Sequence, residues 1–261
     1  MTDKAVLADQ YGDNNRLTAR QSLWAHREGP GLPAVVLDRA ELTGTETIVD
    51  VGCGNGTYLA ELARRQHRGP VVGLDLSPAM ARRSAAHGST AVADAQALPL
   101  ADHSVDAVLS LHMLYHVPDI ERAIAELRRV LRPGGPALVT TNGPGHTREV
   151  KRLFAAAARR VGGVQVDVDW DTRRFAPHEA RQLLGAVFNS ITVYEVSDTT
   201  PVRDPSVLVD YVASWPPESV GLRAGPLWEQ VMTAVEDLVA AHFAAHESFS
   251  VSSRVAILRA R

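Results

Sequence analysis

The chain has little of what several protein classes require. Its 261 residues include one cysteine, Cys53, so an internal disulfide is excluded. No run of about 18 apolar residues occurs, which excludes a membrane-spanning helix. The formal net charge of −3 gives no basic excess of the kind that a nucleic-acid-binding surface needs. We therefore expect neither nucleic acid nor a membrane as a partner.

The N-terminal segment is polar and lacks the apolar stretch of a secretory signal, which makes the cytoplasm the expected location. Hydrophobic residues make up 45% of the chain and charged residues 22%, as is typical of a globular protein that buries a core without disulfides or metal. Lysine is also scarce. Only Lys4 and Lys151 occur among 27 basic residues, which we interpret as codon bias in a GC-rich genome.

Short apolar runs alternate with helical segments between residues 47 and 141. The runs are typical of buried strands and lie at 47–51, 71–75, 90–93, 105–111 and 137–141. Helices are predicted between them at 58–66, from Ser77-Pro78 onward and at 120–131. This alternation predicts βαβ units and a parallel sheet with helices on both faces.

The sequence on either side of this region is less regular. Further helices are predicted at 15–27, 34–42, 150–161 and 177–187. Two more strands are predicted at 191–196 and 251–258, with roughly fifty residues between them, too many for a plain connection. That insert contains helical stretches at 207–215 and 227–246, and we expect it to form a lid or cap.

A glycine-rich loop follows the first strand and opens a helix. Gly52, Gly54 and Gly56 allow a tight turn and a close approach of the backbone to a ligand. Thr57 occupies the position where a dinucleotide fingerprint needs a third small residue, and no Lys-Ser/Thr pair of a phosphate-binding loop follows. The loop therefore favours a nucleoside without phosphates; the alternative is a tight turn without a ligand.

Carboxylates follow the second and third strands. Asp75 can accept hydrogen bonds from both hydroxyls of a ribose, at about 1.5–3 kcal/mol each. Asp94 can accept a hydrogen bond from the exocyclic amine of a purine. The structural alternatives are a strand-end or helix-capping acid for Asp75 and a turn or helix-capping acid for Asp94.

Four segments, in this order, resemble the motifs of small-molecule class I S-adenosylmethionine-dependent methyltransferases. They are IVDVGCGNGTY (48–58), VVGLDLSPAM (71–80), ADAQALPLADHSVDAVLSLHMLYHVPD (93–119) and RVLRPGGPALVT (129–140). The resemblance covers about residues 45 to 145, and the other residues match the family only in general layout. It implies S-adenosylmethionine as the cofactor and methyl transfer as the activity.

The resemblance also implies the fold. The expectation is an α/β protein with a doubly wound, seven-stranded Rossmann-like sheet of order 3-2-1-4-5-7-6, in which strand 7 is antiparallel. The predicted strands at 191–196 and 251–258 fit positions six and seven. The expected domains are an N-terminal helical lid (1–43), the cofactor-binding core (44–196 and 250–261) and a helical cap insert for substrate between strands 6 and 7 (197–249).

On the methionyl side of the cofactor, the resemblance implies roles by motif position. Gly52, Gly54 and Gly56 are expected to face the methionyl part. Asp50 is expected to fix the loop and the amino group of the cofactor. Leu111 is expected to offer its backbone carbonyl to the methionyl ammonium.

On the nucleoside side, Asp75 is expected to take the ribose hydroxyls and Leu76 to pack on the adenine. Asp94 and Ala95 are expected to meet the adenine amine and ring edge. Acidic residues suit this ligand because it is cationic and carries no phosphate. In the N-terminal lid, Tyr11, Arg16 and Arg20 are candidates to close over the cofactor.

Arg20 is the lid residue with a specific expected partner, the methionyl carboxylate. The alternative is a solvated arginine. Cys53 is interpreted as a packing residue inside the glycine loop and not as a nucleophile.

Histidines supply the candidates for a general base, which is needed only when the acceptor must lose a proton. His116 is the lead candidate, and His112 and His146 are weaker ones. The alternative for His116 is a histidine that bonds to the backbone and packs the floor of the pocket. His112 and His116 have the spacing of metal ligands, but we expect no metal because no third ligand is nearby.

Aromatic residues are distributed unevenly along the chain. All tryptophans and phenylalanines lie outside residues 45–141. The non-core segments contain Trp170, Phe175, Trp215, Trp228, Phe243 and Phe249. These side chains suit a hydrophobic or aromatic acceptor, or they pack the cap helices onto the sheet. The expected protein is a small-molecule methyltransferase of bacterial specialised metabolism, either a monomer or a homodimer.

Two alternatives stay open on sequence grounds. One is a non-catalytic S-adenosylmethionine-binding or regulatory protein, because a fold does not fix a function. The other is a nicotinamide-dependent oxidoreductase, which would have to bind a dinucleotide tightly. Thermal shifts measured with each cofactor would distinguish the oxidoreductase from the methyltransferase and from the non-catalytic S-adenosylmethionine-binding protein.

Overall fold

A computed structural model describes residues 15–169 and 174–261 of the chain. These residues form a seven-stranded sheet with the order β3-β2-β1-β4-β5-β7-β6. The strands are β1 (Ile48–Val51), β2 (Val71–Asp75), β3 (Ser89–Val92), β4 (Ala107–Leu111), β5 (Ala137–Asn142), β6 (Ile191–Val202) and β7 (Phe249–Ala260). β1 to β5 pair in parallel, and β7 is antiparallel to both β5 and β6. The predicted strand order and the antiparallel seventh strand are confirmed.

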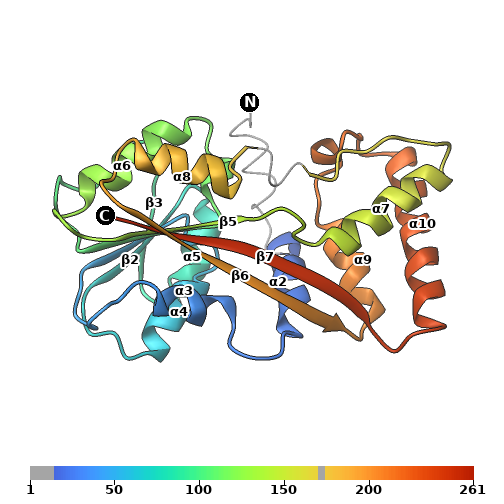
Figure 1. The fold of residues 1–261 in the computed structure, drawn as a ribbon, viewed down its shortest axis with the longest axis horizontal. Helices are drawn as coiled ribbons and strands as arrows, with labels where there is room; N and C mark the ends of the chain where they lie inside the picture. The colour runs from blue at the N-terminus through green and yellow to red at the C-terminus, as the bar shows by residue number, and fades with distance from the viewer. Residues whose placement is uncertain (1–14, 170–173) are drawn as a thin grey trace.

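The helices occupy the N-terminal end of the described chain and connections between the strands (Figure 1). The α-helices are α2 (Asn15–Ala25), α3 (Leu32–Asp38), α4 (Thr57–Arg64), α5 (Pro78–Ser84), α6 (Ile120–Val130), α7 (Arg148–Arg160), α8 (Pro177–Gly185), α9 (Pro205–Ala213) and α10 (Pro226–Phe243). The 3₁₀ helices are η1 (Leu114–His116) and η2 (Pro217–Val220). None of the helices among residues 15–169 and 174–261 combines the length and apolarity that crossing a membrane requires.

The central strands β1 and β4 are buried along their whole length, so the side chains that point to either face of the sheet are covered. On one face, Val49 and Val51 of β1 pack with residues of α6 and α8 such as Leu127 and Leu184. On the other face, residues of α3 and α4, including Leu37 and Leu62, pack on alternate strand positions. Figure 1 shows α6 and α8 on the opposite side of the sheet from α3 and α4.

β6 and β7 form a two-stranded ribbon that extends well beyond the parallel strands. Their register runs from Ile191 opposite Ala260 to Val202 opposite Phe249. In Figure 1 the ribbon crosses the molecule from the sheet to α9 and α10. The strands are therefore longer than the predicted 191–196 and 251–258, and residues 197–202 of the expected cap insert belong to β6.

At the far end of the ribbon, α7, α9 and α10 pack together, and we call these three helices the cap. Their shared cluster contains Phe154 of α7, Val212 of α9 and Val235 of α10, each fully buried. Leu23 of α2 is buried in the same cluster. Helix α7, which the predicted domain division assigned to the core, thus packs with α9 and α10, and the predicted lid helix α2 packs against the cap.

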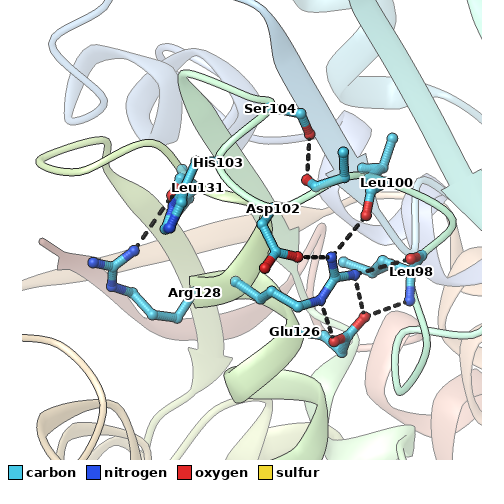
Figure 2. A network of polar contacts seen from close by, with 10 residues as sticks. Leu98, Leu100, Asp102, His103, Ser104, Glu126, Arg128 and Leu131 are labelled. Carbon is cyan, nitrogen blue, oxygen red and sulfur yellow. Dashed lines mark hydrogen bonds and ion pairs between the residues drawn. The ribbon is translucent and has the colours of Figure 1, made fainter.

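The loop between β3 and β4 is fixed to α6 by a network of polar contacts that joins Leu98, Leu100 and Asp102 to the residues around Glu126 (Figure 2). The Arg129 guanidinium donates to both carboxylate oxygens of Glu126 at 2.6 and 2.7 Å and to Asp102 at 2.7 Å. It also donates to the carbonyls of Leu98 and Leu100. Because Asp94 lies near the start of this loop, the network holds one wall of the candidate site in place.

Candidate functional site

The carboxyl ends of the parallel strands open into one large cavity of about 890 Å³. Ligands of open α/β sheets bind at this edge. The large cavity is closed from the other side by α2 and by residues of the β6–β7 ribbon and the cap. Predicted site residues that line it are Arg20, Gly52, Gly54, Asp75, Leu76, Asp94, Ala95, Leu111, His112, His116 and His146. Tyr11 lies outside the described residues.

The glycine loop turns sharply because Gly52, Gly54 and Gly56 all have positive φ, at 78°, 55° and 87°. A Cβ on Gly52 would lie 2.8 Å from the side chain of Met113, so a larger residue there has no room. Gly56 starts α4 and does not line the cavity; a Cβ there would lie 3.0 Å from the backbone of Ser84. Gly56 therefore shapes the loop from behind, by close packing against α5.

Asp75 lies at the end of β2 and is held by backbone donors. Its Oδ2 accepts a hydrogen bond from the amide of Gly54 at 2.8 Å, and its Oδ1 accepts one from Ser77 at 2.8 Å. Burial raises the pKa of Asp75 although both hydrogen bonds lower it. A carboxylate offers about four lone-pair positions, so two stay available for donors in the cavity.

Asp50 lies beneath the glycine loop and does not line the cavity. Its side chain is 1% exposed, and Oδ2 has no hydrogen-bond partner among the described residues. Burial, together with the nearby charge of Asp75, raises the pKa of Asp50 to about 7. A positive charge placed near Asp50 would stabilise the ionised form of this carboxyl.

Asp94, Ala95 and Leu76 form the wall that the Arg129 network supports. Oδ1 of Asp94 accepts hydrogen bonds from the amide of Gln96 at 2.9 Å and from its side chain at 3.0 Å. Ala95 is buried, while 40% of Leu76 is exposed, which is unusual for a large apolar side chain at a cavity. The exposed Leu76 gives this wall an apolar surface for a flat ligand.

The segment after β4 carries two of the predicted histidines. Leu111 ends the strand, and His112 has a left-handed backbone with φ 55°, fixed by an amide hydrogen bond to Thr140 Oγ1 at 2.9 Å. The Nε2 atom of His112 is buried without a partner among the described residues. His116 ends the short η1 helix, and its ring contacts that of Tyr115 at 4.5 Å.

His146 has a different environment from the other two histidines. Its Nδ1 accepts a hydrogen bond from the amide of Arg254 at 3.1 Å, and its ring lies 5.3 Å from Trp24 of α2. The bond to Arg254 fixes the tautomer, with the proton on Nε2. His146 thus packs and bonds as a structural residue, even though it lines the cavity.

All three histidines are held in the neutral form. Burial lowers the pKa of His112 to about 4 and is the largest cause of lowering for the other two, each to about 3. For His116 the charges of Arg20 and Arg174 lower the pKa further. Among the described residues, no group of three or more His, Cys, Asp and Glu side chains is arranged to hold a metal ion.

Helix α2 joins the glycine loop to the cap. Gln21 exchanges two side-chain hydrogen bonds with Asn55, at 2.7 and 3.2 Å, and donates to Thr57 Oγ1 at 3.1 Å. The neighbouring Arg20 donates to the carbonyl of Ser214 at 2.8 Å and to its hydroxyl at 3.3 Å, at the end of α9. Arg20 therefore faces the cap side of the cavity.

Most of the aromatic side chains of the non-core segments pack within the protein. Trp228, Phe243 and Phe249 pack against the cap cluster, and Phe175 is fully buried against the sheet. Trp215 packs in the cap as well, with its ring 5.4 Å from Phe154. Trp170 lies outside the described residues. The packing interpretation therefore accounts for most of the uneven aromatic distribution, and the large cavity is lined instead by Trp24, Tyr58, Tyr115 and Tyr211.

Residues 49–139 match a family model described as a methyltransferase domain. The glycine loop, Asp75 and Asp94 thus all lie in the part of the chain that matches a methyltransferase domain. A structure from Anabaena variabilis described as a methyltransferase of an antibiotic biosynthesis pathway is 18% identical, with a TM-score of 0.63, over 88% of this chain and 96% of that one. At 18% identity, this similarity shows a shared fold and no more.

Curated relatives match this chain over part of their length. Malonyl-[acyl-carrier protein] O-methyltransferase 1 of Coxiella burnetii is 38% identical over 114 residues, which are 44% of this chain and 40% of that protein. The malonyl-[acyl-carrier protein] O-methyltransferase of Geobacter sulfurreducens is 36% identical over 157 residues, 57% of each chain. The chain thus spans about half the length of these relatives.

The large cavity fits the cofactor of this methyltransferase domain. Its volume lies in the range of about 300–1,000 Å³ that is usual for ligand sites. His112 lines the cavity, and its Nε2 is a buried polar atom without a partner among the described residues, as expected beside a polar ligand. The acids at its wall, Asp75 and Asp94, suit a cationic molecule without phosphates.

Several residues that line the large cavity were not predicted from the sequence. Gln21, Trp24, Met113 and Asn142 come from α2, from the residues after β4 and from the end of β5. Asn55 was within the recognised loop, and its polar side chain was the available signal. For Gln21 and Trp24 no local signal exists, because their place depends on how α2 docks onto the glycine loop and the cap.

Proposed function

We propose that this protein transfers the methyl group of S-adenosylmethionine to a small-molecule acceptor with a hydrophobic or aromatic part. One observation carries the proposal: the glycine loop, Asp75 and the neutral His116 all face the same large cavity. Cofactor-binding groups and a proton acceptor thus share one space, with apolar and aromatic walls between them.

For the cofactor, we assign roles by position in the large cavity. Asp75, held by Gly54 and Ser77, accepts from the ribose hydroxyls. Asp94 and Ala95 face the adenine, with Leu76 against its ring. The backbone of Gly52 and Gly54 and the carbonyl of Leu111 face the methionyl part. Asp50 stabilises the positive charges from beneath the loop.

S-adenosylmethionine supplies a methyl group that is already activated by its bond to a cationic sulfur. The protein therefore contributes chiefly by holding the acceptor in line. His116 is the proposed base, since it lines the large cavity and its lowered pKa keeps the ring in the neutral form that a base requires at pH 7. His146 is less suited because its Nδ1 already accepts from Arg254.

The relatives named above are O-methyltransferases that act on a malonyl group carried by an acyl-carrier protein. Because they share about half their length with this chain, they support methyl transfer more than they support a particular acceptor. We propose a free small molecule, which the cap and α2 enclose. We further propose that the cap, α7 included, forms the acceptor side of the site.

The test has two stages. Calorimetric titration with S-adenosylmethionine and S-adenosylhomocysteine measures cofactor binding. Radiolabelled S-adenosylmethionine is then offered with phenols, amines, terpenoids, carboxylic acids and a malonyl-acyl-carrier protein. We expect micromolar cofactor binding and label in a free small molecule. Binding without transfer to any acceptor would support the non-catalytic S-adenosylmethionine-binding protein, and labelling of the carrier-bound malonyl group alone would overturn the free acceptor.

A further inference from the structure

A smaller cavity, which we call the recess, lies beside the large one and has a volume of about 70 Å³. Five residues line both spaces: Arg20, Tyr115, His116, Asn142 and Tyr211. The recess ends at Thr147, Lys151 and Trp215. A water molecule occupies about 30 Å³ of the liquid, so the recess has room for about two waters or one carboxylate group.

The recess has a buried positive charge at its end. Lys151 lines the recess and is only 5% exposed, so its positive charge belongs to a largely buried side chain. Its Nζ lies 3.6 Å from Oδ1 of Asp169, a carboxylate whose side chain is 76% exposed. Lys151 is also one of two lysines in a chain that otherwise uses arginine.

A second cation lies at the entrance. The hydrogen bonds of the Arg20 guanidinium within the described residues go to Ser214, which is neutral. The charge of Arg20 lowers the pKa of His116, and that of Lys151 lowers the pKa of His146, in both cases after burial as the main cause. None of the residues that line the recess is acidic.

An unpartnered hydroxyl lines the recess together with these two cations. Thr147 is 1% exposed, and its Oγ1 has no hydrogen-bond partner among the described residues. The residue precedes the 13-residue helix α7 with a left-handed backbone, and its side chain does not cap the helix. The positive end of the helix dipole adds to the field of the two cations. A buried hydroxyl without a partner requires an explanation, and a bound acceptor group provides one.

We infer that the recess is the binding site for a carboxylate of the methyl acceptor. Lys151 and Arg20 neutralise the carboxylate, and the Thr147 hydroxyl donates a hydrogen bond to it. The rest of the acceptor extends past Tyr115 and His116 into the large cavity. This inference rests on the proposed function and names its substrate class: a small carboxylic acid whose methyl-accepting atom is separate from the anchored carboxylate.

The distribution of charge supports this assignment. The acids Asp75 and Asp94 line the large cavity at the ends of β2 and β3, where a cationic cofactor is proposed, and they do not line the recess. The recess holds cations, so it suits the ligand of opposite charge. Electrostatic complementarity of this kind keeps two ligands in their own places.

The test compares a carboxylate with its neutral amide. Benzoate and benzamide are titrated by ligand-observed NMR into the wild-type protein and its variants, with and without saturating S-adenosylhomocysteine. We expect benzoate to bind at least tenfold more tightly than benzamide. Lys151→Met is expected to reduce this ratio to below twofold, and Thr147→Val to reduce it about threefold. Arg152→Met, an exposed neighbour on α7, is the matched control and leaves the ratio unchanged.

Three results overturn the inference. The first is a wild-type protein that binds benzoate less than twofold more tightly than benzamide, and the second is a folded Lys151→Met variant that keeps the full wild-type ratio. The third is a Lys151→Met variant that binds S-adenosylhomocysteine more weakly while its ratio of benzoate to benzamide affinity is unchanged. The last would place the carboxylate of the cofactor in the recess. Circular dichroism checks folding, and Thr147→Val, which only removes a hydroxyl, repeats the test if Lys151→Met does not fold. Because the ratio is also measured without S-adenosylhomocysteine, failure of cofactor binding refutes the proposed function separately.

Discussion

The two ends of the large cavity are built in different ways. The cofactor end consists of loops that directly follow β1, β2 and β3, and its key carboxylate, Asp75, is held by backbone amides within the same motifs. The proposed acceptor end, taken together with the recess beside it, draws on α2, η1, the start of α7 and the end of α9, which are far apart in sequence. A site built from local sequence motifs suits a ligand that many related proteins share, such as a cofactor. A site assembled by tertiary packing can change its ligand without disturbing the cofactor site.

The largest effect is expected at the acceptor end. His116→Ala should lower kcat about a hundredfold, since a positioned base contributes about 10²- to 10⁴-fold. The dissociation constant of S-adenosylmethionine should change less than threefold, because the proposed cofactor contacts lie elsewhere. Steady-state turnover and calorimetry measure the two quantities. His178→Ala, an exposed histidine of α8, is the control. Equal losses of turnover and cofactor affinity would show that the two ends are not separate.

At the cofactor end, Asp75→Ala should weaken S-adenosylmethionine binding at least tenfold while the fold stays intact. The substitution removes the acceptor proposed for the ribose hydroxyls and leaves the amides of Gly54 and Ser77 without their partner. Calorimetry gives the affinity and circular dichroism the fold. The comparison variant is Asp204→Ala, which removes a helix-capping carboxylate of α9 away from the cavity. Unchanged affinity in Asp75→Ala would refute the assignment of this pocket.

At Asp50 we expect a smaller effect, which is a dependence of S-adenosylmethionine affinity on pH. Its pKa of about 7 means that the free protein holds this carboxyl partly protonated at neutral pH. A cationic cofactor favours the carboxylate, so binding releases a proton and becomes tighter as pH rises through 7, by about fivefold between pH 6 and 8. Calorimetry in two buffers of different ionisation enthalpy detects the proton. Asp50→Asn should bind with no such dependence; a proton release that persists in Asp50→Asn comes from another group.

The smallest effect is expected in the pH dependence of turnover. Burial, with the charges of Arg20 and Arg174, lowers the pKa of His116 to about 3, so the side chain is neutral throughout the range from pH 5.5 to 7.5. With saturating cofactor and an acceptor that does not titrate in this range, kcat should vary less than twofold. A fall in kcat centred near pH 6.5 would mean that a solvated histidine, and not His116, is the base.

The same division separates what the sequence could predict from what it could not. The apolar runs predicted βαβ units and a parallel sheet, and the strand order was predictable only because the motifs resemble those of a family with that order. Asp75 and Asp94 could be named because the strand end alone fixes their position. In the structure, these residues lie at one edge of the sheet and line one cavity.

At the acceptor end the sequence carried weaker signals. Lys151 was noticed only as a rare residue type, since nothing local shows that it is buried beside a cavity. Arg20 was expected to meet the methionyl carboxylate, and the structure places it on Ser214 of the cap, beside the recess. Gln21, which bonds Asn55 of the glycine loop, could not be found because 34 residues separate the two.

The most direct measurement is a crystal structure of the protein with S-adenosylhomocysteine and benzoate bound. The account predicts that the carboxylate of Asp75 accepts hydrogen bonds from both ribose hydroxyls, that the cofactor sulfur faces His116 across the large cavity, and that benzoate places its carboxylate between Lys151 and Thr147. A cofactor whose ribose lies away from Asp75, or whose sulfur faces away from the acceptor end, would contradict the central claim that one cavity brings donor and acceptor together.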